Sequence, residues 1–175
     1  MNLKIVKKNF VLKYLKSNIR TRGLDKLDTL HKISKVGILA ETDLFQTYDF
    51  TKNLSSNFGL DTNDFNIILY ENSKIIENLG DYRYFSEKDF GMFGKILGKD
   101  LKNFVDTKFD LLINYCTHED VFSELVCIKS KAQLVAGFKS ETYDNYDISI
   151  KIESNKIDTF NEELTKYLQI LKVLK

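Results

Sequence analysis

Short apolar runs alternate along this 175-residue chain with longer segments of helical periodicity, and this alternation narrows its fold more than any other feature. Compact apolar runs typical of buried strands occur at 35–40 (KVGILA), 65–71 (FNIILYE), 109–116 (FDLLINYC) and 132–138 (AQLVAGF). Strands that alternate with helices form a mainly parallel sheet with helices on both faces. The sequence therefore predicts a three-layer, Rossmann-like α/β sandwich.

The character of each run predicts its place in the sheet. The strand 35–40 is expected to be central, beside 109–116. The run YDISIKI, 146–152, alternates strictly between apolar and polar residues, so it is expected to be half exposed, at or near a sheet edge. YRYF, 82–85, could add a brief strand. Helices are expected over 3–20, 43–58, 73–79, 99–106, 118–130 and 158–174.

Charge is unevenly distributed along the chain, although the net charge is only +1. Residues 1–35 hold ten lysines and arginines against two aspartates, whereas the rest of the chain holds sixteen basic and twenty-three acidic residues. We therefore expect a basic helix at 1–22, followed by a single α/β domain at 35–175. Six of its basic side chains are candidates for binding a partner: Lys4, Lys7, Lys8, Lys13, Lys16 and Arg20.

The apolar residues of this basic helix form two stripes at 100° per residue. Leu3, Val6, Phe10 and Tyr14 make the first stripe, and Ile5, Leu12, Leu15 and Ile19 make the second. We expect one stripe to pack on the domain and the other to have a separate neighbour. That neighbour would be nucleic acid, an anionic bilayer or an acidic protein. The alternative is that the helix only neutralises the acidic domain.

The glycine-rich stretch DFGMFGKILGKD, 89–100, contains two incomplete nucleotide motifs. A phosphate loop needs G-x-x-x-x-G-K-[ST], but Gly94 and Gly98 are one residue too close, and Asp100 stands where the hydroxyl belongs. The kinase reading of the tripeptide DFG fails because no H-R-D-type loop precedes it and the chain is too short. We predict that this stretch makes tight turns and binds neither ATP nor GTP.

A small-molecule site, if there is one, is expected where strands 35–40 and 109–116 end, because open α/β sheets bind ligands where their strand order reverses. This candidate crevice would be lined by Glu41, Thr42, Asp43, Cys116, Thr117 and His118. Cys116 could act as a nucleophile with His118 as its base, or the cluster could hold a metal. The plainer and favoured reading is a helix capping box from Thr117 to Asp120. The glycine-free turn AETDLF argues against an ordinary dinucleotide-binding domain.

Composition and the longest uncharged run bear on metal binding and on cellular location. Two cysteines and two histidines, without a C-x-x-C pair, give little support to a zinc site, and we predict no metal and no cofactor. No secretory signal is visible, and the longest uncharged run near a strand, 111–118, is far too short to cross a bilayer. A cytoplasmic location is therefore expected.

Four phrases resemble an uncharacterised family of small cytosolic α/β proteins known chiefly from flavobacteria and their relatives. They are SEKDFGMFGK at 86–95, KFDLLINYC at 108–116, KSKAQLVAGF at 129–138 and ELTKYLQILK at 163–172. The resemblance covers the chain from about residue 3 onward and implies a bacterial cytosolic protein without a known activity. From FDLLINY through LVAGF the chain is also similar to the amino-terminal half of heptosyltransferase-like glycosyltransferases, which implies only a fold, because those enzymes need a second nucleotide-sugar domain.

Two functions therefore stand. The favoured one is a non-enzymatic binding or adaptor module whose basic helix contacts an anionic macromolecule or a membrane surface. The alternative is a small Rossmann-like enzyme or ligand binder that uses the crevice near Cys116 and His118.

Overall fold

A single six-stranded, all-parallel sheet forms the centre of the computed structural model, which describes residues 3–17, 30–71, 81–116, 120–143 and 145–174. The strand order is β3-β2-β1-β4-β5-β6, so β1 lies in the middle beside β4, and β6 lies at an edge. Both predicted placements are confirmed. The strands are β1 (Val36–Glu41), β2 (Phe65–Tyr70), β3 (Arg83–Phe85), β4 (Leu111–Asn114), β5 (Leu134–Phe138) and β6 (Ile148–Ile150).

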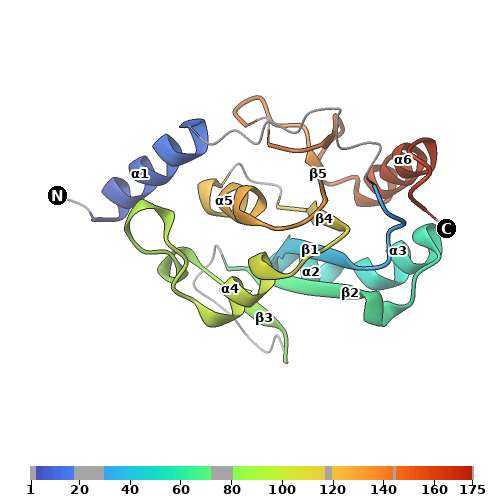
Figure 1. The fold of residues 1–175 in the computed structure, drawn as a ribbon, viewed down its shortest axis with the longest axis horizontal. Helices are drawn as coiled ribbons and strands as arrows, with labels where there is room; N and C mark the ends of the chain where they lie inside the picture. The colour runs from blue at the N-terminus through green and yellow to red at the C-terminus, as the bar shows by residue number, and fades with distance from the viewer. Residues whose placement is uncertain (1–2, 18–29, 72–80, 117–119, 144, 175) are drawn as a thin grey trace.

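Helices cover both faces of the sheet, which confirms the predicted three-layer fold (Figure 1). On one face lie α3 (Phe50–Phe58) and α6 (Ile157–Ile170), and on the other lie α4 (Lys99–Asp106) and α5 (Val121–Lys129). The first helix, α1 (Leu3–Ser17), lies outside α5. The shorter elements are the helix α2 (Thr42–Thr47) and the 3-10 turns η2 (Thr62–Asp64), η3 (Glu87–Asp89) and η4 (Met92–Gly94).

The strands form two cores because successive side chains point to opposite faces of a sheet. In β1, Ile38 is buried against the α3 and α6 side, whereas its neighbour Leu39 is buried against the α4 and α5 side. In β6 only one face is buried, and Ser149 between the two isoleucines is exposed, as its alternation predicts. Burying an Ile or Leu side chain stabilises the folded protein by roughly 1.5–3 kcal/mol.

The single helix predicted over 43–58 is wrong, because the structure has two helices there. Tyr48 ends α2 with an extended backbone (φ −135°), and Asp49 caps α3 by accepting a hydrogen bond from the Lys52 N–H at 3.0 Å. The Tyr48 hydroxyl donates to Asp158 at 2.6 Å, which holds this break against α6. The predicted end of α3 at Gly59 is confirmed, with a left-handed backbone (φ 66°).

Two further helix predictions differ from the structure or fall outside the residues that it describes. The helix expected over 118–130 begins at Val121, because Asp120 is its cap and accepts from the Phe122 N–H at 2.7 Å. The residue that caps this helix is therefore Asp120, whereas Thr117 was predicted to begin the capping box. Residues 117–119 lie outside the described residues, and so does the helix expected over 73–79.

Candidate functional site

The candidate crevice lies at the carboxyl edge of the sheet, where β1 and β4 pair side by side and the strand order reverses. Glu41 and Thr42, at the end of β1, are buried, whereas Asp43 is exposed. Cys116, just past β4, is partly exposed and lies close enough to Glu41 for their charges to interact. Thr117 and His118 lie outside the described residues. The structure thus brings Glu41 and Cys116 together and leaves the predicted base unplaced.

The surroundings of Cys116 do not activate a thiol. Burial raises the pKa of the Cys116 thiol well above its usual value, and Glu41, Cys127, Asp120 and Glu124 raise it further. The nucleophilic form of cysteine is the thiolate, which an acidic and dehydrated environment disfavours. The described residues therefore favour a protonated, unreactive thiol.

A buried polar network lies behind Cys116 and was not predicted. The Asn114 carboxamide accepts from the Cys116 N–H at 2.9 Å and donates to the Tyr146 hydroxyl at 2.9 Å. The Tyr146 hydroxyl in turn donates to the Glu124 carboxylate, which also accepts from Asn145 at 3.2 Å. Glu124 is only 4% exposed, so these partners offset the cost of burying its charge.

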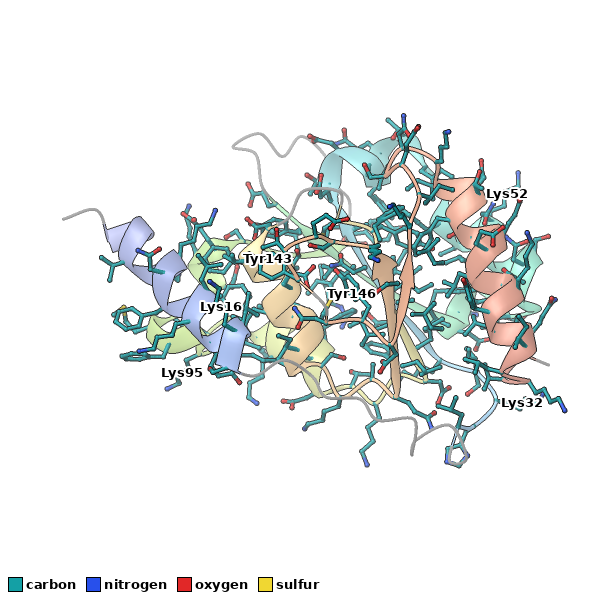
Figure 2. The ribbon with its side chains drawn as sticks, turned by 90° about the horizontal axis from the view of Figure 1, so that it is seen from above. Lys16, Lys32, Lys52, Lys95, Tyr143 and Tyr146 are labelled. Atoms are coloured by element: carbon teal, nitrogen blue, oxygen red, sulfur yellow. The ribbon has the colours of Figure 1, made fainter. Side chains whose placement is uncertain are left out.

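Gly137 in β5 makes room for this network. A Cβ atom at Gly137 would lie 2.7 Å from the ring of Tyr146, too close for any real contact. The ring therefore packs directly on the strand backbone, and its hydroxyl reaches Glu124 and Asn114 (Tyr146 is labelled in Figure 2). One sequence signal was available: Glu124 is the lone acidic residue in the apolar helix VFSELVCIK.

The described polar groups at the carboxyl edge do not suit a phosphate. Glu41, Asp43 and Asp120 are all acidic, and the Tyr70 hydroxyl is bonded to Asp120, which together with burial raises the pKa of Tyr70. Phosphates need N–H donors or cations instead. Within the described residues no group of three or more His, Cys, Asp or Glu is placed to hold a metal ion. The Thr42 hydroxyl is buried and has no hydrogen-bond partner in the part of the chain that the structure describes.

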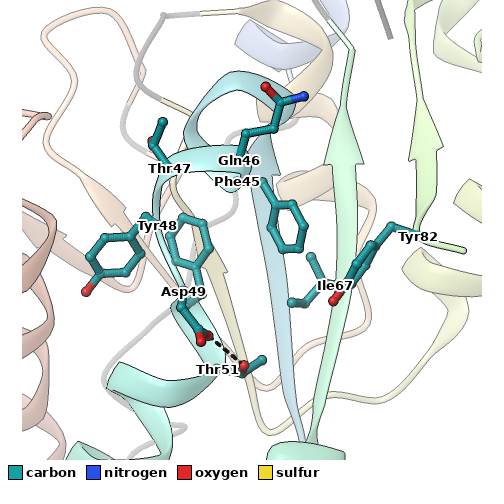
Figure 3. A pocket seen from close by; sticks show the side chains of 9 residues that line it. Phe45, Gln46, Thr47, Tyr48, Asp49, Thr51, Ile67 and Tyr82 are labelled. Carbon is teal, nitrogen blue, oxygen red and sulfur yellow. Dashed lines mark hydrogen bonds between the residues drawn. The ribbon is translucent and has the colours of Figure 1, made fainter. Parts of the chain in front are cut away.

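A pocket of about 420 Å³ opens where α2 meets α3 and was not predicted (Figure 3). Phe45, Ile67 and Tyr82 gather on one of its sides, with the rings of Phe45 and Tyr82 4.5 Å apart. Its carboxylate, Asp49, accepts from the Thr51 hydroxyl at 2.9 Å and caps α3. That carboxylate is used by the fold, so the pocket offers an apolar wall without a reactive group.

The glycine-rich stretch 89–100 forms turns, as predicted. Phe90 and Ile96 make an antiparallel bridge, and Gly98 precedes α4. A Cβ atom at Gly98 would lie 2.4 Å from the Asp89 carboxylate, so a phosphate at the start of α4 would meet a negative charge. This geometry supports the prediction that the stretch does not bind ATP or GTP, which stays a prediction.

The basic helix α1 is fixed to the domain by residues of both predicted stripes and by Val11, which lies between them. Val11 and Leu15 are buried against the α4 and α5 side of the sheet. The Phe10 and Phe93 rings meet at 4.7 Å, and the Lys129 ammonium lies 4.5 Å from the Tyr14 ring centre. Both stripes contribute to this one interface, since Tyr14 belongs to the first and Leu15 to the second. The expectation that each stripe has its own neighbour is therefore wrong.

The lysines of α1 differ in their surroundings. Lys7 is partly buried, donates to the Glu87 carbonyl and lies over the Phe122 ring, and its desolvation lowers the pKa of its ammonium. Lys8, Lys13 and Lys16 are exposed, and none of their ammonium groups has an ion-pair or hydrogen-bond partner among the described residues. The Lys4 side chain and Arg20 lie outside the described part of the chain.

Comparison with known proteins identifies a family. Neither a curated protein nor a solved structure matches the chain. Residues 7–171 match the family of unknown function DUF6913, which spans nearly the whole chain, including most of α1 and both cores. The resemblance to an uncharacterised α/β family is therefore confirmed. The chain belongs to the family of unknown function DUF6913.

Proposed function

We propose that this protein is a binding module whose first helix contacts an anionic macromolecular surface through Lys8, Lys13 and Lys16. The observation that carries the proposal is that all three side chains are exposed, and unpaired within the described residues, on a helix that the domain holds in place through Val11 and Leu15. Fixed, unpaired charges attract a partner of opposite sign without an entropic cost for ordering the helix.

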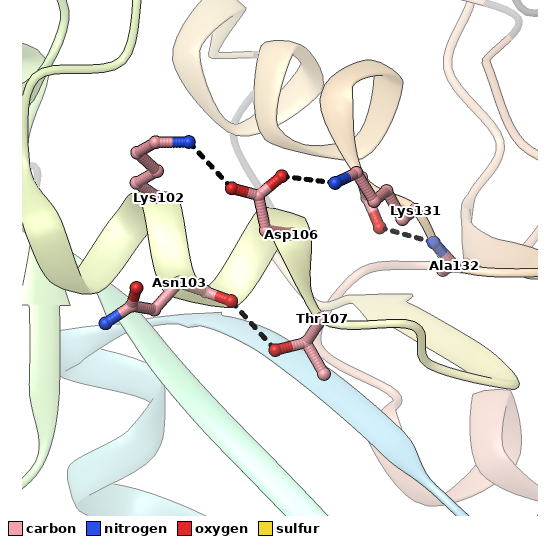
Figure 4. A network of polar contacts seen from close by, with 7 residues as sticks. Lys102, Asn103, Asp106, Thr107, Lys131 and Ala132 are labelled. Atoms are coloured by element: carbon pink, nitrogen blue, oxygen red, sulfur yellow. Dashed lines mark hydrogen bonds and ion pairs between the residues drawn. The ribbon is translucent and has the colours of Figure 1, made fainter.

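The alternative role, neutralising the acidic domain, has less support because acidic side chains of the domain pair with the domain's own lysines. Asp106 binds both Lys102, at 2.8 Å, and Lys131, at 2.6 Å (Figure 4). Glu163 pairs with Lys166 at 2.6 Å. No described acidic residue is paired with Lys8, Lys13 or Lys16.

A cytoplasmic location fits this proposal. Neither Cys116 nor Cys127 forms a disulfide within the described residues, as expected in a reducing compartment. Within the described residues no helix is long and apolar enough to cross a membrane. The flavobacterial origin and the likeness to glycosyltransferases stay predictions.

The test is binding to heparin, a soluble polyanion, as salt is raised. Changing Lys8, Lys13 and Lys16 together to Gln should weaken binding and flatten its salt dependence, because fewer counterions are released when the polyanion binds. For duplex DNA each lost phosphate contact reduces the slope of log affinity against log salt by roughly 0.9. The matched control changes three exposed lysines of the domain, Lys52, Lys139 and Lys151, and alters the net charge equally. Equal loss in both variants would mean that only net charge matters and would overturn the proposal.

A second function, small-ligand binding at the carboxyl edge, is supported by the buried Thr42 hydroxyl, for which the described residues provide no hydrogen-bond partner. An unsatisfied buried hydroxyl costs about 1–3 kcal/mol, so a ligand that bonds it would gain that free energy. The test is Thr42→Val. The ligand-free variant should unfold at the same or a higher temperature than wild type, and a ligand that stabilises wild type should lose its effect on the variant. A less stable ligand-free variant would contradict this account.

A further inference from the structure

An apolar tip lies beside α1 on the turn between Gly91 and Gly98. Met92, Phe93 and Leu97 are 45%, 64% and 60% exposed. The other large apolar side chains that are exposed in the described residues are three tyrosines and Ile170. The tip is therefore a group of apolar side chains that are exposed to solvent close together in the sequence. Exposed apolar patches often mark interaction surfaces.

The tip is held rigidly by backbone hydrogen bonds. The Gly91 N–H donates to the Lys95 carbonyl at 2.7 Å, and the Leu97 N–H donates to the Asp89 carbonyl at 2.8 Å. Gly94 packs on α5, where a Cβ atom would lie 2.9 Å from Leu125. The tip is thus anchored at its base and projects Met92 and Phe93 outward.

Phe93 adopts a left-handed backbone (φ 59°) that costs a phenylalanine roughly 1–2 kcal/mol. Asparagine or glycine would fit this conformation better and would leave no ring in water. Strain of this kind is found most often at residues that serve binding.

Positive charge surrounds the tip. Lys95 and Lys99 are exposed within or next to it. Phe10, whose ring contacts Phe93, lies three residues from Lys13 and so shares its side of α1. Figure 2 shows Lys16 and Lys95 at the end of the molecule that α1 and the tip form together. The Asp89 carboxylate is turned inward and accepts from the Ser86 N–H at 2.9 Å, which leaves Asp100 as the exposed acid beside the tip.

We propose that the anionic surface is a lipid bilayer, with Met92, Phe93 and Leu97 inserted among the headgroups and the lysines bound to anionic lipids. This inference rests on the proposed function and names its partner. Peripheral proteins bind membranes by combining buried apolar area with attraction to anionic lipids. A nucleic acid would use the lysines but gives aliphatic side chains such as Met92 and Leu97 no apolar medium. A projecting tip also suits a deformable interface, whereas a protein partner would need a matching pocket.

The experiment is vesicle co-sedimentation of the full chain with phosphatidylcholine vesicles, with and without phosphatidylserine, beside heparin binding. Wild type should bind only the phosphatidylserine vesicles. The tip variant, Met92→Ser with Leu97→Ser, should partition roughly tenfold less onto them and bind heparin normally. Changing Lys8, Lys13 and Lys16 to Gln should weaken vesicle binding by a factor on the order of 100 and also weaken heparin binding.

The control variant removes exposed apolar surface elsewhere, by changing Tyr167 and Ile170 on α6 to Ser, and should bind vesicles as wild type does. Thermal unfolding of each variant separates loss of binding from loss of fold. Wild type that binds heparin but not the anionic vesicles would overturn the bilayer and leave the proposed function standing. Wild type that binds neither would overturn both. Normal vesicle binding by the folded tip variant would overturn insertion of the tip.

Discussion

The carboxyl edge of the sheet and the end formed by α1 and the 91–98 turn use polar groups in opposite ways. At the carboxyl edge, Glu124 and Asn114 are buried and hydrogen-bonded to Tyr146, so their polar groups are satisfied inside the fold. At the other end, Lys13 and Lys16 have no partner among the described residues, and Phe93 is largely exposed. The first arrangement stabilises the protein by itself, whereas the second becomes favourable only when something else binds.

This contrast corrects an assumption about where a Rossmann-like sheet carries its function. Ligands of open α/β sheets usually bind where the strand order reverses. Here the described residues at that position are acidic and mostly satisfied, and Cys116 is kept protonated. The features that support the proposed binding lie instead on the added helix and on a glycine-rich turn, outside the layers that define the fold.

The largest effect is expected from breaking the buried network. Gly137→Ala would place a Cβ atom 2.7 Å from the Tyr146 ring and push its hydroxyl away from Glu124. We expect a loss of roughly 3 kcal/mol in the free energy of unfolding, measured by urea denaturation.

The matched control is Gly91→Ala, where the nearest atom to a new Cβ would be 3.4 Å away and φ is negative. Its stability should change by less than about 0.5 kcal/mol. An equally stable Gly137→Ala protein would show that the network does not depend on the close approach of Tyr146.

Cys116 offers a sharper probe of the same region. Since burial and nearby acidic groups raise the pKa of its thiol, less thiolate is present at neutral pH than in an unfolded peptide. Iodoacetamide should therefore modify Cys116 more slowly in the folded protein than in urea, and the folded rate should keep rising as the pH passes the usual value for a free thiol. Mass spectrometry of the peptides separates Cys116 from the buried Cys127. Rapid modification of Cys116 at neutral pH would revive the nucleophile hypothesis.

The amino-acid pattern predicted the fold better than the sites, for physical reasons. Strands β1 and β4 were predictable because all of their residues are buried and all but the last of each, Glu41 and Asn114, are apolar. The pairing of Glu124 with Tyr146 was not, because it joins residues 22 positions apart through a space that Gly137 leaves open. The local pattern of apolar and polar residues does not predict contacts between residues so far apart in the sequence.

Two interpretations failed for a related reason. The periodicity of 43–58 continues through Tyr48, but the Asp49 cap and the contact of Tyr48 with Asp158 divide the helix. On α1 the stripes were grouped without Val11, which the fold buries completely. The turns at Gly91, Gly94 and Gly98 were anticipated, whereas the exposure of Met92 and Phe93 was not, because an apolar residue in a turn can point inward or outward.

A small effect on stability is expected from removing the exposed ion pairs that Asp106 forms with Lys102 and Lys131. Hydrogen bonds from Lys102 and Lys131 lower the pKa of Asp106 from 3.8 to about 2. The folded protein thus binds this proton less readily than the unfolded chain, so the pairs stabilise it above a pH of about 4, and this contribution disappears as the pH falls toward 2. Asp106→Asn should therefore be slightly less stable than wild type at pH 7, and thermal unfolding should show the difference shrinking with acid. A difference that grows on acidification would contradict the assignment.

The most direct test of the central claim uses the absence of tryptophan from this chain. Met92→Trp would place the only indole at the tip, where it is expected to be exposed and to emit at long wavelength. With phosphatidylserine-containing vesicles the emission should shift to shorter wavelength, and lipids brominated near the headgroup should quench it. With phosphatidylcholine vesicles or heparin it should not shift. An emission that stays unchanged while the protein co-sediments with the anionic vesicles would contradict the claim that the 91–98 tip enters the membrane.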